Sequence, residues 1–214
     1  GKFEMLAPLK DREQLQQLIN WTIDRYYPQH TGEDKVLAWF REVVEKTAAL
    51  MVEWQRGGFV HGVMNTDNMS ILGLTIDYGP FSFLDNYDHN FTPNTTDLPG
   101  RRYAFGNQAS VAYWNLGKLA NTISLIFEDT EALEEALNFY EQHFWTGYYG
   151  MMGNKLGLDQ VEKEDKELIA EFEKTLSSLQ PDMTLFYRSL AEVTPEMPDK
   201  DIFPHFAASF YEEL

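Results

Sequence analysis

The chain has 214 residues, of which 43% are hydrophobic and 24% are charged, a composition typical of one soluble globular domain. The net charge of −17 argues against binding to nucleic acid or to an anionic membrane surface, because both need a basic face. The absence of cysteine excludes disulfides, thiol catalysis and thiolate metal sites. No apolar run is long enough to span a bilayer and the first residues lack a signal-peptide pattern, so the sequence predicts a cytoplasmic protein.

Helical periodicity dominates the sequence. The first strong helix is predicted to start at Asp11, with Gln14 in the capping-box position, and to stop at Pro28. A longer amphipathic helix follows over about 34–56 and is ended by the glycines at 57–58. Further helices are predicted over 107–126, 131–149, 161–179 and 182–192. The remaining tail holds three prolines and is expected to be extended up to a short final turn.

The middle of the chain has a different pattern. Residues 59–86 are rich in β-branched, aromatic and glycine residues, and they predict a two-stranded element between about 69 and 84. Residues 86–102 carry Asn, Asp, Thr, Pro and Gly without periodicity, which is typical of a long functional loop. The predicted fold class is therefore mainly α with a small β-hairpin, in a single domain over 1–214.

Polar side chains flank the predicted hairpin. Asp67 and Asn68 precede the apolar segment 70–76, and Asp77 follows it. A hairpin there would bring Asn68 and Asp77 to the same end, and their oxygens are the hard ligands that nucleotide-bound Mg²⁺ prefers. An ordinary hairpin with Asp, Asn and Gly at its turns gives the same pattern. In protein kinases a catalytic-loop Asn and the Asp of Asp-Phe-Gly hold the metal; here Asn68 lies seven residues after His61, and Asp77 begins Asp-Tyr-Gly.

The run over residues 61–85 resembles the signature of the selenoprotein O family. Residues 1–4 resemble the Gly-His-Phe-Glu of that family, residues 103–108 resemble its Tyr-Ala-Phe-x-Asn-Gln, and Trp-Asn-Leu at 114–116 follows in register. The resemblance covers about residues 1–190. Family members are similar to protein kinases in fold and are described as pseudokinases that transfer AMP, rather than phosphate, to protein hydroxyls.

The resemblance implies a kinase-like C-lobe with three parts. Residues 59–85 would hold the catalytic and metal loops, residues 86–105 an activation-segment-like loop, and residues 106–214 a helical remainder. The implied cofactors are ATP and Mg²⁺ or Mn²⁺, and the implied partners are proteins modified on Ser, Thr or Tyr hydroxyls.

The resemblance also assigns roles to individual residues. Asp67 corresponds to the proposed proton acceptor of the family, and Asn68 and Asp77 correspond to its metal ligands, with Asp77 also near the nucleotide phosphates. An ordinary kinase would place its catalytic Asp two residues after His61, where this chain has Val63. Asp67 could therefore act as the base or as an outer carboxylate beside the metal.

No Gly-x-Gly-x-x-Gly phosphate loop occurs in the sequence. The run 147–153 superficially resembles one, but it follows a predicted helix, and a helix-ending loop is the preferred interpretation. In the family, the Gly, Lys and Arg residues that grip the nucleotide precede the segment matching Gly1. We therefore expect the chain to be the C-lobe part of an enzyme, without its N-lobe and inactive when isolated.

Two alternatives stay open: a catalytically silent binding module, and a true protein phosphotransferase that delivers the γ-phosphoryl group.

Overall fold

The computed structural model describes residues 2–6 and 11–210, so Gly1 of the motif at 1–4 lies outside the described residues. The fold is mainly helical, as the sequence predicts. The helices are α1 (Lys2–Leu6), α2 (Arg12–Tyr26), α3 (Lys35–Gly57), α4 (Gln108–Ile123), α5 (Glu131–Leu156), α6 (Asp165–Leu179), α7 (Met183–Leu190) and α8 (Asp199–Phe206). Short 3-10 turns cover Thr95–Asp97, Phe105–Asn107, Ser124–Ile126 and Ala207–Ser209. The strands, β1 (Phe59–Val60) and β2 (Ser82–Phe83), have two residues each.

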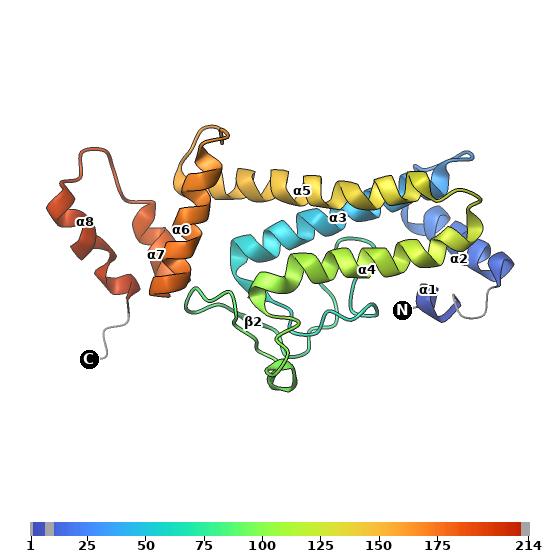
Figure 1. Cartoon of the computed structure of the whole chain (residues 1–214), viewed down its shortest axis with the longest axis horizontal. Coiled ribbons are helices and arrows are strands. Elements are labelled where there is room, and N and C mark those ends of the chain that lie inside the picture. The colour runs from blue at the N-terminus through green and yellow to red at the C-terminus, as the bar shows by residue number, and fades with distance from the viewer. Residues whose placement is uncertain (1, 7–10, 211–214) are drawn as a thin grey trace.

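Three long helices form the body of the molecule. Figure 1 shows α3, α4 and α5 running side by side along the long axis, with α1 and α2 at one end and α6, α7 and α8 at the other. The non-helical segment that joins α3 to α4 lies along one side of these helices and contains β2. None of the helices in the described part of the chain is long and apolar enough to cross a membrane.

The core is built on the apolar stripe of α3. This helix buries residues at helical spacing, and they pack against α2, α4 and α5: Val36, Trp39, Phe40, Val43, Val44, Ala48, Met51, Val52 and Trp54. A smaller apolar cluster joins the strands to α6 and α7 and consists of Val60, Leu84, Tyr87, Phe105, Leu176 and Met183. The strands are therefore fixed between two apolar clusters rather than by a sheet of their own.

The predicted helix ends are confirmed at two places. The side chain of Asp11 accepts a hydrogen bond from the backbone N–H of Gln14 at 2.9 Å, which is the expected N-cap. Gly58 ends α3 in the left-handed region, with φ +68°, a conformation that glycine adopts without a steric cost.

The predicted two-stranded antiparallel element is present, but its predicted bounds of 69 to 84 are wrong. β2 pairs instead with β1, in antiparallel register, with Phe59 opposite Phe83. Residues 70–76 form an irregular loop against α3, and Gly73 lies so close that a Cβ there would be 2.9 Å from the Cβ of Lys46. Ile71 packs on the helical core rather than on a partner strand. The apolar pattern of this loop is therefore explained by burial against a helix.

Two further predictions are corrected. The run 147–153 is neither a phosphate loop nor a helix-ending loop, because α5 continues through it to Leu156. Gly147 instead allows close packing of α5 on α3, since a Cβ there would be 3.1 Å from Cγ2 of Val52. The proline-containing tail is not extended but forms α8, with Pro198 at the N-cap, where no backbone N–H is needed.

Candidate functional site

The candidate site is built around the fully buried His61. Its ring Nε2–H donates to the carbonyl oxygen of Ile76 at 2.8 Å. Its Nδ1 accepts from the backbone N–H of Val63 at 3.4 Å, so these two bonds together require a neutral ring with its proton on Nε2. His61 therefore joins the start of the loop at 61–68 to the residue that precedes Asp77.

Trp54, near the end of α3, supports this connection. Its indole ring stacks on the ring of His61, with centroids 5.5 Å apart. Its Nε1–H donates to Oγ1 of Thr75 at 2.9 Å. One aromatic residue of the central helix thus holds both the histidine and the segment that the histidine binds.

Buried amides of α4 hold the backbone on either side of His61. Nε2 of Gln108 donates to the carbonyl of Phe59 at 2.8 Å, and its Oε1 accepts from the N–H of His61 at 2.9 Å. Nδ2 of Asn115 donates to the carbonyl of Met64 at 2.9 Å. Both amides lie in sequence motifs that gave them no role of their own, and the structure shows what they bind.

The loop at 86–105 contributes two more contacts to the loop at 61–68. Nδ2 of Asn94 donates to the carbonyl of Gly62 at 3.2 Å, and the hydroxyl of Tyr103 donates to Oδ1 of Asn65 at 2.6 Å. Gly62 has φ +81°, and a Cβ there would lie 2.7 Å from the carbonyl oxygen of Pro80. The close approach of Gly62 to Pro80 therefore depends on a glycine at position 62.

The two predicted metal ligands are connected through this frame. Nδ2 of Asn68 donates to the carbonyl of Val63 at 3.0 Å, which fixes the orientation of the amide. In the described part of the chain nothing donates a hydrogen bond to Oδ1 of Asn68. Asp77 is exposed and has φ +54°, a left-handed conformation that Asp tolerates better than most residues. Because Val63 and Ile76 both bind the ring of His61, the segments carrying Asn68 and Asp77 are tied to one imidazole.

By residue type, Asn68 and Asp77 offer the hard oxygen donors that a divalent cation prefers. No group of three or more His, Asp or Glu side chains that could hold a metal is found within residues 2–6 and 11–210. Mg²⁺ usually takes only one or two protein oxygens and completes its shell with water and substrate phosphates. One amide oxygen and one carboxylate match that requirement.

Asp67 lies next to Asn68 and is exposed. It lines a cavity of about 360 Å³ between the loop at 66–72, α3 and α4. Asn115 lines the same cavity, and its Oδ1 is buried without a hydrogen-bond partner among the described residues. Asp67 is thus accessible to a substrate group, as a proton acceptor must be.

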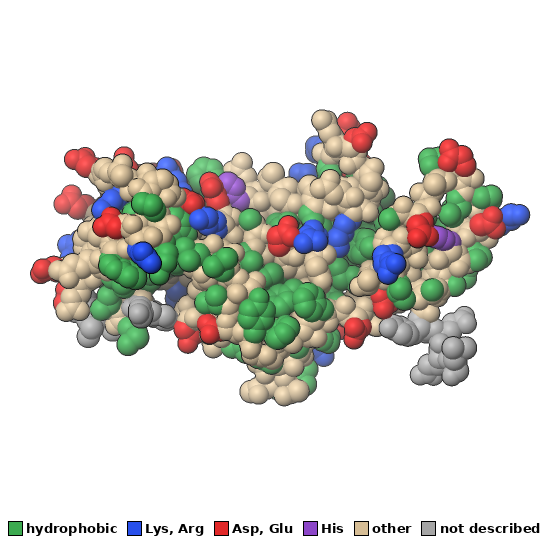
Figure 2. Space-filling view, turned by 180° about the vertical axis from the view of Figure 1, so that it is seen from behind, with side chains coloured by type: hydrophobic (Ala, Val, Ile, Leu, Met, Phe, Trp, Pro, Cys, Tyr) green, Lys and Arg blue, Asp and Glu red, His purple; other side chains and the backbone are tan. Residues whose placement is uncertain are grey.

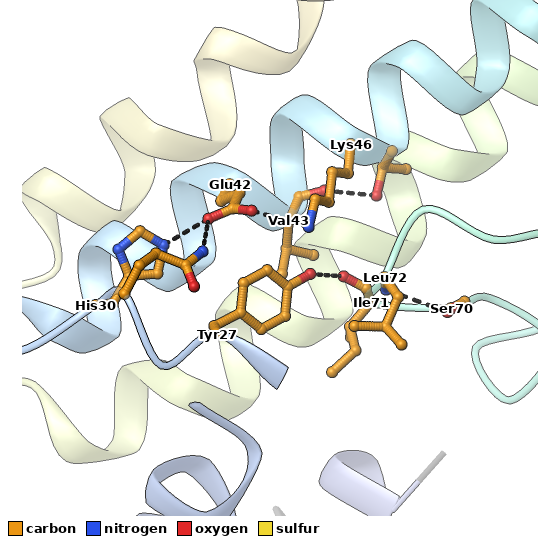
Figure 3. A network of polar contacts seen from close by, with 10 residues as sticks. Tyr27, His30, Glu42, Val43, Lys46, Ser70, Ile71 and Leu72 are labelled. Atoms are coloured by element: carbon orange, nitrogen blue, oxygen red, sulfur yellow. Dashed lines mark hydrogen bonds and ion pairs between the residues drawn. The ribbon is translucent and has the colours of Figure 1, made fainter. Parts of the chain in front are cut away.

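A polar network anchors the loop that follows the site. Figure 3 shows the hydroxyl of Tyr27 donating to the carbonyl of Ile71, so α2 and the loop at 70–76 are linked directly. Nζ of Lys46 lies 4.4 Å from the centre of the Tyr27 ring and 2.8 Å from the carboxylate of Glu42. The ring of His30 lies 2.7 Å from the same carboxylate (Figure 3).

Aromatic residues next to Asp77 are exposed. Tyr78, Phe81 and Phe83 are 59%, 43% and 56% exposed, and their rings surround the buried ring of Phe59. Figure 2 shows a cluster of hydrophobic side chains on the face around the non-helical segment. An exposed aromatic surface of this kind is available for contact with another domain or molecule.

Known proteins resemble this chain along its whole length. Residues 1–206 match the family model described as protein adenylyltransferase SelO. The chain is 54% identical to the protein nucleotidyltransferase YdiU of Cytophaga hutchinsonii over all of its own length and 42% of that protein. It is 44% identical to the YdiU of Xanthomonas campestris pv. campestris strain B100, over all of its own length and 41% of that protein. The chain therefore spans about two fifths of the length of these relatives.

Proposed function

Since the chain belongs to the SelO family, we propose that it carries the metal-binding and catalytic loops of a kinase-like protein adenylyltransferase. The enzyme would transfer AMP from ATP to Ser, Thr or Tyr hydroxyls of proteins. The observation that carries this proposal is the link from His61 to both Val63 and Ile76, which ties the segments of Asn68 and Asp77 to one buried ring. Two hard oxygen ligands from separate segments suit a metal-bound nucleotide.

The proposed chemistry uses three side chains. Asn68 and Asp77 would hold Mg²⁺ or Mn²⁺, which supplies positive charge against the phosphates when bound. The substrate hydroxyl oxygen forms a bond to the α-phosphorus of ATP, and the bond between that phosphorus and the pyrophosphate leaving group breaks. Asp67 accepts the proton of the hydroxyl, since it is exposed beside Asn68. In the alternative role, Asp67 binds a water molecule of the metal and does not take the proton.

We also propose that a second lobe, outside these 214 residues, grips the phosphates. The sequence holds no Gly-rich phosphate loop, and its 34 acidic against 17 basic residues repel a tetra-anion. The exposed rings of Tyr78, Phe81 and Phe83 beside Asp77 are a surface that such a lobe would cover. The 214-residue chain alone is therefore expected to bind Mg-ATP weakly.

The test uses the full-length protein with ATP labelled separately at the α- and γ-phosphorus. Label from the α-position on protein supports the proposal, label from the γ-position indicates a phosphotransferase, and no label from either indicates a silent binding module. Asp77→Asn and Asn68→Ala are expected to lower α-label transfer at least ~100-fold, because the developing charge loses its metal. Asp24→Asn changes an exposed carboxylate of α2 and should leave transfer unchanged.

A second variant separates the two roles of Asp67. If Asp67 takes the proton, Asp67→Asn lowers kcat by ~100-fold or more at every metal concentration and removes the acidic limb of the pH profile. If it binds a metal-bound water, the same variant raises the Mn²⁺ concentration needed for half-maximal rate, and excess metal restores kcat.

A further inference from the structure

A large cavity lies away from the candidate site. It measures about 1280 Å³ and lies between α3, α5 and α7, at the end of the long helices that meets the C-terminal helices in Figure 1. None of Asp67, Asn68 and Asp77 lines it. Whatever binds there would do so independently of the metal ligands.

One part of this cavity is apolar. Its lining includes two methionines, Met151 of α5 and Met183 of α7, which adapt to ligands of different shape. The other apolar residues are on α3 and in or beside β2: Ala49, Val52, Phe83 and Leu84. Gly150 of α5 also lines it, and a Cβ there would meet no atom within 4 Å, so the glycine leaves the space open.

The cavity is also lined by three cationic side chains, although the protein has twice as many acidic as basic residues. These are Arg56 at the end of α3, Lys155 at the end of α5 and Arg188 on α7. Arg56 pairs with Glu53 at 2.7 Å. Neither Lys155 nor Arg188 has a carboxylate within 4 Å among residues 2–6 and 11–210.

Lys155 has no carboxylate beside it, since the two carboxylates that line the cavity lie elsewhere: Glu45 is 3.6 Å from the ring of His143 and Glu53 is 2.7 Å from Arg56. The side chain is half-buried, and its Nζ lies 3.9 Å from the centre of the Tyr187 ring. Burial, together with the charge of Arg56, lowers the pKa of Lys155 to about 8. A cation that burial destabilises in this way is stabilised when an anion binds beside it.

We propose that this cavity binds a phosphate monoester with an apolar group, its phosphate held by Lys155 and Arg188 and its apolar group placed against Met151 and Met183. Two cations without a carboxylate partner match the charge of a phosphate dianion, and arginine can bind phosphate through two parallel hydrogen bonds. The apolar lining provides the remaining contact area, as in most small-molecule sites.

The test uses the 214-residue chain with ¹³C-labelled methionine methyl groups. Titration with hexyl phosphate should shift the signals of Met151 and Met183 in a saturable way, whereas the signal of Met64, which is fully buried elsewhere, stays in place. Hexanol and inorganic phosphate should each bind about tenfold more weakly or worse, because each offers only half of the ligand. Equal binding of hexanol would overturn the role of the cations, and equal binding of inorganic phosphate would overturn the role of the apolar lining.

Matched substitutions locate the phosphate. Lys155→Met and Arg188→Met should each weaken binding of hexyl phosphate about tenfold. Lys174→Met removes the same charge from the exposed face of α6, where Lys174 pairs with Glu171, and should leave the affinity unchanged. A similar loss in all three variants would mean that net charge, not this cavity, attracts the ligand.

The unsubstituted chain gives an independent check through pH. The affinity should be highest between the second pKa of the phosphate, about 6, and the pKa of Lys155, about 8. Above that range Lys155 loses its proton and the affinity falls. Several charged and titratable side chains surround Lys155 in or beside this cavity. They are Glu45, Glu53 and Arg56 of α3, His143 of α5, Glu173 of α6, whose charge reaches Tyr187, and Tyr187 and Arg188 of α7. An affinity that stays constant from pH 7 to pH 9.5 would contradict the proposal.

Discussion

The three long helices and the segment that joins α3 to α4 are held by different interactions. The helices pack through a broad apolar stripe in which many residues share the burial, such as Trp39, Phe40 and Met51. The segment at 59–105 follows its path because single polar side chains bind its backbone, among them His61 and Gln108. Apolar burial is non-directional, so neighbours absorb part of a loss, whereas each of these hydrogen bonds has no substitute. The difference predicts distinct responses to substitution.

The largest effect is expected in the helical body. Phe40→Ala should lower the free energy of unfolding by about 3–5 kcal/mol, because the ring of Phe40 is fully buried and its removal leaves a cavity in the core. Phe139→Ala, which changes a 45% exposed ring of α5, should cost less than about 1 kcal/mol. Urea unfolding of both variants measures this. Equal losses of stability in the two variants would mean that the ring of Phe139, which is exposed in the structure, is buried in solution.

Gly62→Ala tests the close approach in the segment. The new methyl group would meet the carbonyl of Pro80 at a residue with φ +81°, and we expect a loss of at least about 2 kcal/mol. Gly117→Ala is the matched control, because Gly117 lies within α4 and a Cβ there meets no atom within 4 Å. That variant should be neutral or more stable by up to about 1 kcal/mol. A tolerated Gly62→Ala would contradict the observed path of the loop.

Gln108→Met tests whether the two regions respond separately. It keeps the volume but leaves the carbonyl of Phe59 and the N–H of His61 buried without partners, at a cost of about 2 kcal/mol. Hydrogen exchange should become faster at 59–68 and remain slow in the middle of α3 and α5. Gln142→Met, on the exposed face of α5, is the control. Uniformly faster exchange would show that the segment and the helices unfold as one unit.

The helical body could be predicted from the sequence because the residues that specify each helix lie within or next to that helix. The capping residue Asp11, the glycines at 57–58 and the apolar periodicity of 34–56 all lie within the elements they specify. The same local reasoning failed for 70–76, whose apolar residues were interpreted as a strand. Their partners, Tyr27 and Trp54, are distant in the sequence, and no local pattern signals a hydrogen bond from either of them to this loop.

The residues of the candidate site stay a prediction, and what the structure adds is how the segments that carry them are connected. The spacing of His61, Asn68 and Asp77 predicts a metal-binding pair, Asn68 and Asp77, joined by a hairpin. In the structure the segments that carry this pair are joined through the ring of His61 instead. Gln108 and Asn115 had no assigned role, since an amide within a helical pattern gives no sign of its partner. Their position in motifs of the family was the only available signal.

Glu42→Gln gives the smallest expected effect and tests the link between the two regions. Burial by itself would raise the pKa of Glu42, but hydrogen bonds from Lys46, His30 and Gln29 outweigh it and hold the pKa below its usual 4.5. The carboxylate in turn positions Lys46 over Tyr27, which binds the loop at Ile71.

Because the pKa of Glu42 is lower in the folded than in the unfolded chain, its charge contributes stability that is fully present above about pH 4.5 and is lost as the pH falls through the folded-state pKa. Glu42→Gln should therefore cost about 1 kcal/mol at pH 7, and the difference from the unsubstituted chain should shrink toward zero in acid. Glu135→Gln, an exposed residue of α5, should show no such dependence. Urea unfolding at pH 7, 5 and 3 measures the difference. If the difference in free energy of unfolding between Glu42→Gln and the unsubstituted chain stays constant from pH 7 to pH 3, the substitution acts by disturbing packing and not by removing a charge. The network around Glu42 would then not be the polar link between α3 and the loop at 70–76.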